Sequence, residues 1–272
     1  MEHSKTRILY RDDDLVAVHK PAGVKVHHSR GDSPRQAFML QMTRDLTGRK
    51  VFPVHRLDQP TAGVLLFAFS SEVARLLAQQ FKLQSIAKRY VAVARGIVDP
   101  AGTIDYPLVP DAYAPKAGQI PKDAVTDFER LATAELPIAL GRFSSCRYSL
   151  VAVCPRTGRM HQIRRHFHHI SHPLIGDTAY GDGRHNRLFR EQFGCHRLLL
   201  ACVAVALNHP VTGTPLHLTA PLEPAFQEAI GHLGWLGVPL GKTVLIPKAA
   251  NADTLIETDS KPQLAREVPH VD

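Results

Sequence analysis

The chain has 272 residues, 44% of them hydrophobic, and a formal net charge of +8. This length is long for one domain and short for two, so we expect a single folded unit built from two halves. A basic charge balance favours a polyanionic partner, of which nucleic acid is the commonest. A basic enzyme without such a partner would have the same composition.

The cysteines and the apolar runs exclude several classes of protein. There are four cysteines, no C-x-x-C pair occurs, and their spacing fits no zinc module. So few cysteines in a chain of this length indicate thiols in a reducing compartment rather than a disulfide framework. Residues 1–14 lack the apolar core of a signal peptide, and no apolar run approaches the roughly 20 residues of a membrane helix. We therefore expect a cytoplasmic protein.

Two strand–turn–strand units are predicted near the N-terminus. Apolar residues at 8–10 and 15–18 flank an acidic turn, and Pro21 then interrupts the pattern. A second pair of apolar runs, 51–54 and 64–69, flanks a polar, turn-rich loop. We expect this loop to be held between two strands.

A helix and further strands follow. Ser70 precedes apolar residues at helical spacing, so a capped helix is predicted over 71–81. The run 88–93 begins with basic and aromatic residues and continues as a strand. Residues 100–123 hold many Pro, Gly and Ala residues and are expected to be irregular, whereas residues 148–153 alternate as another strand.

The last predicted elements precede a polar segment. Apolar residues recur at helical spacing from Met160 to Ile170 and predict a helix. A strand and a short helix follow at 198–207 and 225–233. Beyond them the chain becomes polar and aperiodic, so we expect a folded domain at 1–247 and a flexible tail at 248–272. No G-x-G-x-x-G or Walker A sequence is present, which disfavours a dinucleotide enzyme or an ATPase.

The polar loop between the second pair of strands carries the sharpest chemical signal. It contains an imidazole, a guanidinium and a carboxylate, in the sequence His55-Arg56-Leu57-Asp58. A cation two residues away favours the ionised carboxylate, which can act as a nucleophile or as a base. A hairpin loop with a surface ion pair explains the same residues without any chemistry. The loop by itself leaves both interpretations open.

Five segments, in this order, resemble the RluA family of pseudouridine synthases. The resemblance extends from about Ile8 to Trp235, and five motifs in order are far more specific than one. The segments are Lys20-Pro21-Ala22-Gly23, His55-Arg56-Leu57-Asp58, Lys88-Arg89-Tyr90, Gly158-Arg159-Met160-His161-Gln162-Ile163-Arg164 and His172-Pro173-Leu174-Ile175-Gly176-Asp177. Two positions depart from the family pattern: His19 stands where relatives usually have Asn, and Ala201-Cys202 stands where many have His-Ala.

The resemblance implies an α+β fold with a bent, mixed and mostly antiparallel sheet, flanked by helices, and an active-site cleft between two halves. It implies that residues 1–247 are the catalytic domain of an isomerase that converts a uridine in RNA to pseudouridine without a cofactor or a metal. By the same resemblance, Asp58 is the catalytic aspartate. Tyr90 would line the pocket against the uracil, and Arg164 would pair with Asp58.

The resemblance also implies contacts with a structured RNA. Arg56 would enter the space that the flipped nucleotide leaves, since a long planar cation can stack there. Four further basic residues would contact the RNA: His55, Lys88, Arg159 and Arg165. The chain is most similar to family members that modify tRNA at uridine 65, with ribosomal RNA as the alternative substrate. We expect a monomer, because no coiled-coil seam is present.

The residues themselves support part of this assignment. At about 100° per residue, Arg164 falls roughly 80° from the centre of its apolar stripe, so it flanks the buried face and can reach inward. Arg165 and His169 lie further round and are expected to face solvent or RNA. The plain alternatives are a solvated charge at Arg164 and a core aromatic residue at Tyr90.

Two other classes of protein, a metal-dependent hydrolase and a non-enzymatic RNA-binding protein, would share some of these features. The histidine-rich run from His161 to His172 would suit a metal site, but it contains no Asp, Glu or Cys, and no H-E-x-x-H sequence occurs. Phosphates, which favour basic side chains, suit the run better. A non-enzymatic RNA-binding protein would share the charge but would not need Asp58, and a metal-dependent hydrolase would need a metal.

Overall fold

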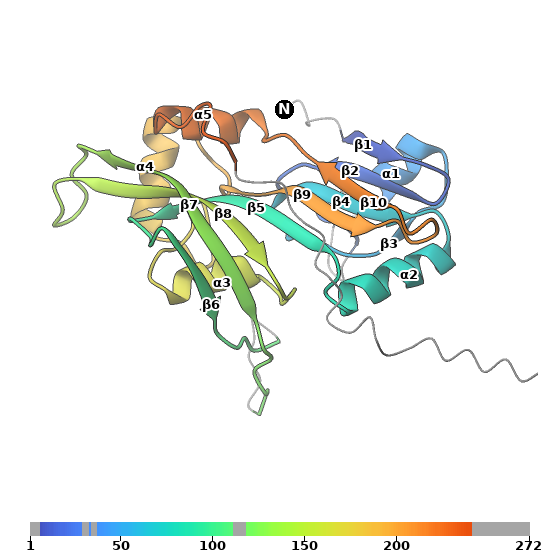
Figure 1. The fold of residues 1–272 in the computed structure, drawn as a ribbon. Coiled ribbons are helices and arrows are strands. Elements are labelled where there is room, and N and C mark those ends of the chain that lie inside the picture. The colour runs from blue at the N-terminus through green and yellow to red at the C-terminus, as the bar shows by residue number, and fades with distance from the viewer. Residues whose placement is uncertain (1–5, 29–32, 34–36, 111–117, 241–272) are drawn as a thin grey trace, which may run out of the picture.

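The computed structural model describes residues 6–28, 33, 37–110 and 118–240 (Figure 1). Over these residues, one sheet of ten strands is flanked by five helices. The predicted tail at 248–272 and the predicted end of the domain at residue 247 lie outside the described residues.

Six elements come first along the chain. Their bounds are β1 Arg7–Arg11, β2 Leu15–Lys20, α1 Met39–Thr47, β3 Phe52–Pro53, β4 Ala62–Ala68 and α2 Ser71–Lys82. Both predicted strand–turn–strand units are confirmed, although β3 is only two residues long. The predicted cap of α2 is also confirmed, because the Ser70 hydroxyl accepts a hydrogen bond from the Val73 backbone at 3.1 Å.

Nine further elements follow. Their bounds are β5 Ala87–Arg95, β6 Ala101–Asp105, β7 Val125–Leu136, β8 Cys146–Pro155, α3 Gln162–His169, α4 Gly183–Phe193, β9 Leu200–Asn208, β10 Pro215–Thr219 and α5 Pro224–His232. The predicted strands that correspond to β5, β8 and β9 and the predicted helices that correspond to α3 and α5 are confirmed.

The sheet is mixed and mostly antiparallel, as predicted. The strands follow the order β1-β2-β4-β9-β5-β8-β7-β6, with β10 paired to β9 and β3 paired to β4. Among the paired strands, β4 and β9 are parallel, at Ala62↔Ala201 and Gly63↔Cys202, and the other pairs are antiparallel. β9 therefore joins a first half (β1 to β4, α1, α2 and β10) to a second half (β5 to β8 and α3 to α5).

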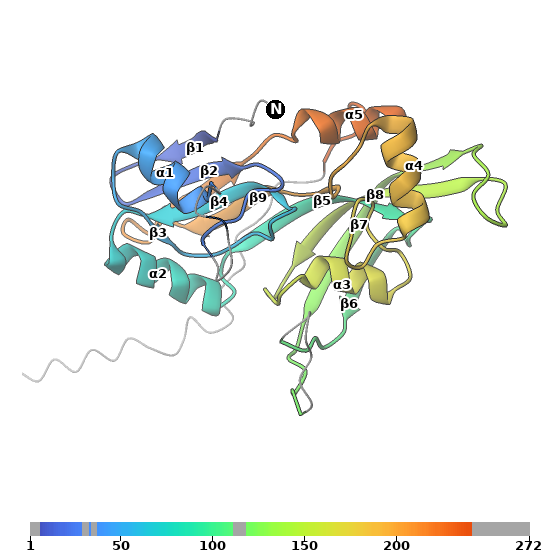
Figure 2. The same ribbon diagram turned by 180° about the vertical axis from the view of Figure 1, so that it is seen from behind.

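Each half has its own apolar core. In the first half, α1 and α2 pack on β2 and β4 around fully buried residues such as Phe67 and Leu77. In the second half, successive residues of β5 face opposite sides of the sheet, so Val91 packs with α4 and α5, whereas Ala92 packs with α3. Figures 1 and 2 both show α2 and α3 on the same side of the sheet, with α5 on the other side.

Gly63 permits the close pairing of β4 with β9. Its φ is +119°, and a Cβ atom there would lie 2.0 Å from the carbonyl oxygen of Cys202. A side chain at this position would therefore meet both backbone strain and a steric clash. Because Gly63 directly follows the polar loop, this close approach also fixes where the loop ends.

The predicted irregular region at 100–123 is wrong in part. Residues 101–105 form β6, which pairs with β7. β6 is the last strand in the sheet order and buries only Ile104, so its apolar pattern is weak. Four other elements, α1, α4, β7 and β10, are not predicted from the sequence. In α1 the N-cap residue Phe38 makes no side-chain cap bond, so the usual start signal is missing.

Candidate active site

Asp58 lies on the loop between β3 and β4. Leu57 is buried in the first core and fixes the loop from below, and the Thr61 backbone N–H donates to the Asp58 carbonyl at 3.0 Å. The Asp58 side chain remains 19% exposed. The loop therefore presents a partly shielded carboxylate at the start of β4.

Lys20, at the end of β2, holds this loop from within. Its Nζ donates to three backbone carbonyls, those of Pro21, Gln59 and Thr61, at 3.0, 3.0 and 2.7 Å. The side chain is completely buried. Burial lowers the pKa of Lys20 to about 7, against the opposing effect of the Asp58 charge. Lys20 thus fixes the backbone on both sides of the turn that follows Asp58.

The turn after β2 bonds the same loop from outside. The Gly23 backbone N–H donates to the Gln59 carbonyl at 2.8 Å, and the Gln59 side-chain amide donates back to the Gly23 carbonyl at 3.0 Å. The Lys20–Gly23 segment therefore supports the loop and makes no direct hydrogen bond to the Asp58 carboxylate among the described contacts.

Arg164, on α3, links Asp58 to the second half. Its Nη1 lies 3.4 Å from Asp58 Oδ2, while its Nε and Nη2 donate to the two carboxylate oxygens of Asp177 at 2.7 and 2.8 Å. Burial disfavours the charge on Arg164, but the hydrogen bonds and the charge of Asp177, together with Asp58, outweigh it and raise the pKa of Arg164. Arg164 therefore stays cationic beside Asp58.

Asp177 is held rigidly by its own turn. Its Oδ1 accepts hydrogen bonds from the backbone N–H groups of Ala179 and Tyr180 at 2.9 and 3.0 Å. Two residues earlier in the chain, the Ile175 backbone N–H donates to the Val93 carbonyl of β5 at 2.9 Å. Burial alone would raise the pKa of Asp177, but the bonds from Arg164 and from the two amides hold it below its ordinary value. The pair of Asp177 and Arg164 is thus a fixed, charged support.

His161 is a second group that faces Asp58. It is buried, immediately precedes α3, and places its Nε2 4.0 Å from Asp58 Oδ1. Its φ of +54° lies in the left-handed region, which is uncommon for a residue other than glycine. Burial lowers the pKa of His161, against the charge of Asp58, so its ring is neutral near pH 7. Its Nδ1 lies 2.9 Å from the Tyr180 hydroxyl.

Tyr90 lies on β5 beside an irregularity of the sheet. Between Arg89 and Tyr90 the register with β9 shifts, so that Arg89 pairs with Ala204 and Tyr90 with Cys202. Such bulges redirect side chains and are common next to active sites. Burial raises the pKa of Tyr90, and the nearby Cys202 and Asp58 raise it further. Asp58 and Arg164 therefore approach each other from a loop and a helix, and Tyr90, on β5, lies near enough to Asp58 for its charge to act on the phenol.

The ring of His55 is directed into the first half. His55 Nε2 accepts a hydrogen bond from the Leu66 backbone at 2.9 Å, and its ring stacks on Phe81 with 4.8 Å between centroids. Burial, with a smaller effect of the Lys88 charge, lowers the pKa of His55 to about 3. Burial also lowers the pKa of Lys88, on β5. The contacts of His55 place its ring beneath the loop.

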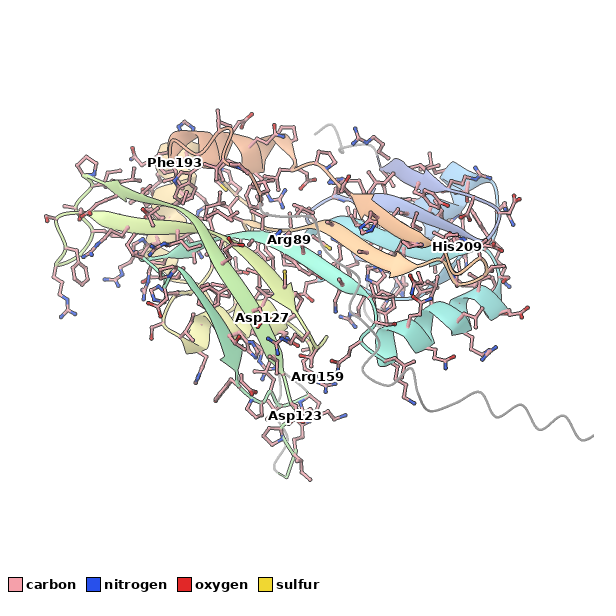
Figure 3. All side chains as sticks on the ribbon, in the orientation of Figure 1. Arg89, Asp123, Asp127, Arg159, Phe193 and His209 are labelled. Carbon is pink, nitrogen blue, oxygen red and sulfur yellow. The ribbon has the colours of Figure 1, made fainter. Side chains whose placement is uncertain are left out.

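The other basic residues of the predicted site lie in two places. Arg56 is exposed on the same loop as Asp58. Arg159 donates from Nε to the Asp123 carbonyl at 2.9 Å, and Figure 3 shows the two residues together at one end of the second half. Arg165 donates from Nη1 to the Val109 carbonyl at 2.9 Å. Arg159 and Arg165 therefore face the connection between β6 and β7.

Most of the histidine-rich run is engaged in bonds within the fold. His166, His168 and His172 each place a ring nitrogen 2.8 to 3.0 Å from a backbone carbonyl. His169 is exposed, as expected, and stacks on Tyr106 with 3.6 Å between ring centroids. These histidines mainly fix α3 to its neighbours.

A cluster of possible metal ligands lies elsewhere, at Asp12, Asp14 and His209. His209 Nδ1 accepts hydrogen bonds from the backbone N–H groups of Val211 and Thr212 at 3.3 and 3.2 Å, so its Nε2 carries the proton. That Nε2 donates to Asp12 Oδ2 at 2.9 Å. These hydrogen bonds therefore link two turns of the first half. Figure 3 shows His209 in this part of the molecule.

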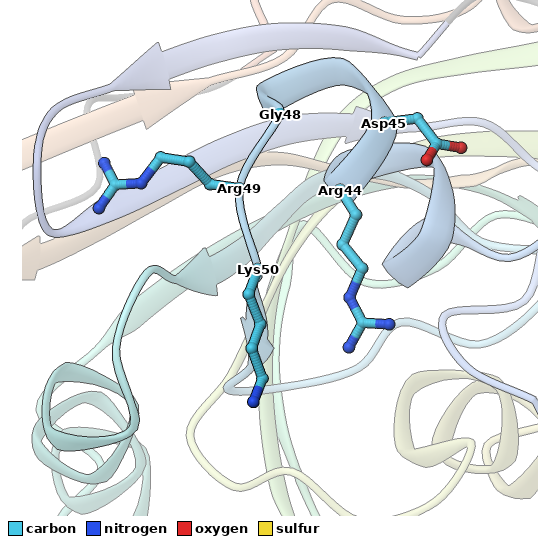
Figure 4. A pocket seen from close by; sticks show the side chains of 5 residues that line it. All are labelled: Arg44, Asp45, Gly48, Arg49 and Lys50. Carbon is cyan, nitrogen blue, oxygen red and sulfur yellow. The ribbon is translucent and has the colours of Figure 1, made fainter.

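A surface hollow of about 450 Å³ lies at the end of α1 (Figure 4). It is lined by Arg44, Asp45, Gly48, Arg49 and Lys50. Two of its cations contact aromatic rings, because Arg49 lies 4.0 Å from the centre of the Phe69 ring and Lys50 lies 5.0 Å from that of Phe52. The hollow contains an acid and none of the residues around Asp58, so it is distinct from the candidate active site.

Four residues of the site are not predicted as site residues: Lys20, His161, Asp177 and Tyr180. A buried arginine needs a carboxylate partner, so Asp177 could have been sought within its motif. Lys20 could have been sought in the same way, as a lysine within an apolar strand. The left-handed backbone of His161 and its bond to Tyr180 leave no trace in the sequence pattern.

A fold of this kind, with a fixed carboxylate–guanidinium pair, defines a class of RNA-modifying enzyme. The family model described as RNA pseudouridylate synthase matches residues 14–169, and the chain belongs to this family of isomerases. It is 47% identical over 253 residues to tRNA pseudouridine synthase C of Yersinia pestis, which covers 90% of this chain and 98% of that protein. It is 45% identical over 235 residues to tRNA pseudouridine synthase C of Haemophilus ducreyi, and this match covers 84% of this chain and 96% of that protein.

A solved structure supports the fold. Human RNA Pseudouridylate Synthase Domain Containing 1 matches with a TM-score of 0.64 and 24% sequence identity, over 82% of this chain and 87% of that chain. The predicted pseudouridine synthase fold is therefore confirmed. Among the described residues, no helix has both the length and the apolar character to span a membrane.

Proposed function

We propose that this protein converts a uridine of tRNA to pseudouridine, with Asp58 as its catalytic carboxylate. The observation that carries the proposal is the approach of Arg164 Nη1 to Asp58 Oδ2, at 3.4 Å, with Asp177 fixing the guanidinium. An adjacent cation keeps a partly buried carboxylate ionised. The relatives named tRNA pseudouridine synthase C support tRNA as the substrate.

The reaction is an isomerisation, so its bonds and protons balance within the nucleotide. The N1–C1′ bond breaks, the uracil turns, and a C5–C1′ bond forms. C5 loses its proton, and N1 gains one. Asp58 could attack C1′ and later be displaced, or it could remove a sugar proton and return it. Both routes need an ionised and well-oriented oxygen, which the contacts of Asp58 supply.

The target uridine must leave the base stack to reach Asp58. Arg56, exposed on the same loop, is proposed to fill the gap, and Tyr90 is proposed to pack against the extruded uracil. Lys88, Arg159 and Arg165 are proposed to contact the RNA. The ring of His55 is occupied by Leu66 and Phe81, so we assign it to the support of the loop.

Within tRNA we propose uridine 65, in the acceptor and T-stem region, as the target. We further propose that the protein acts in the cytoplasm as a monomer, with no metal or cofactor. Pseudouridine mapping in tRNA and ribosomal RNA from a strain that lacks the protein tests the substrate. We expect pseudouridine to be lost at one tRNA site. If pseudouridine is lost only from ribosomal RNA, the substrate is ribosomal RNA and not tRNA.

The change Asp58→Asn tests the catalytic role. It keeps the shape of the side chain and removes the charge, so we expect pseudouridine formation to fall by about 10²- to 10⁴-fold or more. RNA binding should stay within about twofold, because phosphate contacts supply most of the affinity. Asp99→Asn, at an exposed carboxylate, is the control and should change neither. Full activity of the Asp58→Asn protein would refute the role.

A further inference from the structure

We propose that His161 and Tyr180 form a hydrogen-bonded pair that positions Asp58, with the neutral imidazole directing its Nε2–H at Asp58 Oδ1. The inference rests on the proposed catalytic role of Asp58. Its starting point is that the two oxygens of this carboxylate face different groups. Arg164 Nη1 lies 3.4 Å from Oδ2, and His161 Nε2 lies 4.0 Å from Oδ1.

Tyr180 contacts both of the groups that face Asp58, as well as their support. Its hydroxyl lies 2.9 Å from His161 Nδ1, and its ring lies under Arg164, with 5.1 Å from the guanidinium carbon to the ring centre. Its backbone N–H donates to Asp177 Oδ1 at 3.0 Å. Tyr180 therefore contacts His161 and Arg164, which face the Asp58 carboxylate, and also Asp177, which holds Arg164.

The direction of the hydrogen bond between Tyr180 and His161 sets which nitrogen of His161 carries the proton. A neutral imidazole has one donor and one acceptor nitrogen. We assign the Tyr180 hydroxyl as the donor to Nδ1, so the proton lies on Nε2, which faces Asp58. The charges of Arg164 and Arg56 favour the neutral ring, against those of Asp58 and Asp177. Catalytic hydrogen bonds are often long in a free enzyme, so we expect the Nε2–H···Oδ1 contact to shorten when RNA binds.

The backbone of His161 is consistent with a side chain placed for this contact. Its φ of +54° is unfavourable for a residue other than glycine. His161 occupies the N-cap position of α3, yet its side chain makes no cap hydrogen bond. Asn would suit both the backbone and the cap better. Backbone strain of this kind is common at functional sites.

Three variants of the full-length chain test whether Tyr180 and His161 position Asp58 or only stabilise the fold. Tyr180→Phe keeps the ring under Arg164 and removes only the hydroxyl. We expect kcat to fall by about 10- to 100-fold, by analogy with the loss of hydrogen-bond partners that orient metal-bound imidazoles. KM for tRNA and the melting temperature should stay nearly constant. His161→Asn should also lose kcat without losing stability, because Asn tolerates the left-handed backbone.

His161→Gln is the conservative rescue. A glutamine amide reaches about as far as the imidazole Nε2 and supplies its own N–H donor, so this variant should keep most of kcat. It should also be insensitive to a further Tyr180→Phe change, since the hydroxyl acts through the imidazole. Equal losses in His161→Gln and His161→Asn, or losses that follow the melting temperature, would overturn the proposal.

A spectroscopic readout is independent of activity. In histidine-labelled wild-type protein, the ¹⁵N spectrum should show His161, assigned by its absence in His161→Gln, as the neutral Nε2–H tautomer. Its signals should shift in both Tyr180→Phe and Asp58→Asn. The Nδ1–H tautomer, or a signal that ignores both changes, would overturn the proposal. A wild-type protein that shows this tautomer but forms no pseudouridine would contradict only the proposed function.

Discussion

At the level of single residues, one guanidinium serves two carboxylates. Arg164 gives Asp177 two short bonds and gives Asp58 one longer approach. Asp177 is fully buried, whereas Asp58 is partly exposed. The tighter contacts therefore hold Arg164 in place, and the looser one leaves the oxygens of Asp58 available to a sugar. We expect Asp177 to matter for stability more than for any direct chemical step.

Asp177→Asn should destabilise the fold by about 3 to 5 kcal/mol, because it removes the closer of the two counter-charges of the buried Arg164. The pKa of Asp177 is lowered in the folded state. Its contribution is therefore complete above the pKa of the unfolded chain, about 3.9, and is lost as pH falls through the lower folded value. Urea unfolding at pH 7 and near pH 3 measures this.

The difference between wild type and Asp177→Asn should shrink at the acid pH. If the difference in the free energy of unfolding between the two proteins does not depend on pH, the ionised Asp177 is not the source of the stabilisation. Asp127→Asn is a matched control, because this carboxylate bonds Arg156 on a more exposed surface, with 2.6 Å between Nε and Oδ2. It should cost no more than about 1 kcal/mol.

At the level of elements, the decisive contact is the parallel pairing of β4 with β9. Gly63 lies where the backbone of Cys202 comes closest. The loop with Asp58 enters β4 just before this point, and the strand partner of Cys202 on the other side is Tyr90. The position of β9 thus sets the spacing between the loop and the aromatic residue opposite.

Gly63→Ala should lower the free energy of unfolding by about 2 to 4 kcal/mol, the sum of a steric clash and backbone strain. Thermal unfolding measures the loss. Gly183→Ala, at the first residue of α4, is the control, because a Cβ there meets nothing within 4 Å. That variant should be neutral or slightly more stable. Equal melting temperatures for the two variants would contradict the argument.

The elements that the sequence predicts are those whose local pattern agrees with their burial. β2 and β4 are buried along their whole length, and α2 has its Ser70 cap. β6 and α4 bury few residues amid polar ones, so their patterns are faint. Asp58 and Arg164 are predicted as site residues because their motifs mark them. The pairing of His161 with Tyr180 depends on a turn conformation and a tertiary contact, which no local pattern encodes.

At the level of the whole molecule, the candidate site belongs to neither half alone. Asp58 comes from the first half, Arg164 comes from α3 in the second, His161 is the residue just before α3, and Tyr90 lies on the strand beside β9. The site is therefore complete only when β9 has brought the two halves together. Residues of β9 also belong to the apolar cores on both sides, so a change that loosens this strand should affect the site and the packing of both halves together.

A fragment that ends at residue 197, before β9, should fail to fold. β4 would keep β2 and β3 but lose its pairing with β9, and β5 would lose the same neighbour on one side. Circular dichroism and the dispersion of amide NMR signals test this against the full chain. A fragment with a dispersed spectrum and a cooperative melt would show that the halves fold independently.

The late arrival of β9 also has a consequence during synthesis on the ribosome. At about 5 to 20 residues per second, the N-terminal strands emerge many seconds before the strand that completes their sheet. Throughout this interval one side of β4, an apolar strand, presents unpaired backbone groups that other nascent chains can join. The protein should therefore depend on a chaperone in the cell more strongly than its final stability would suggest.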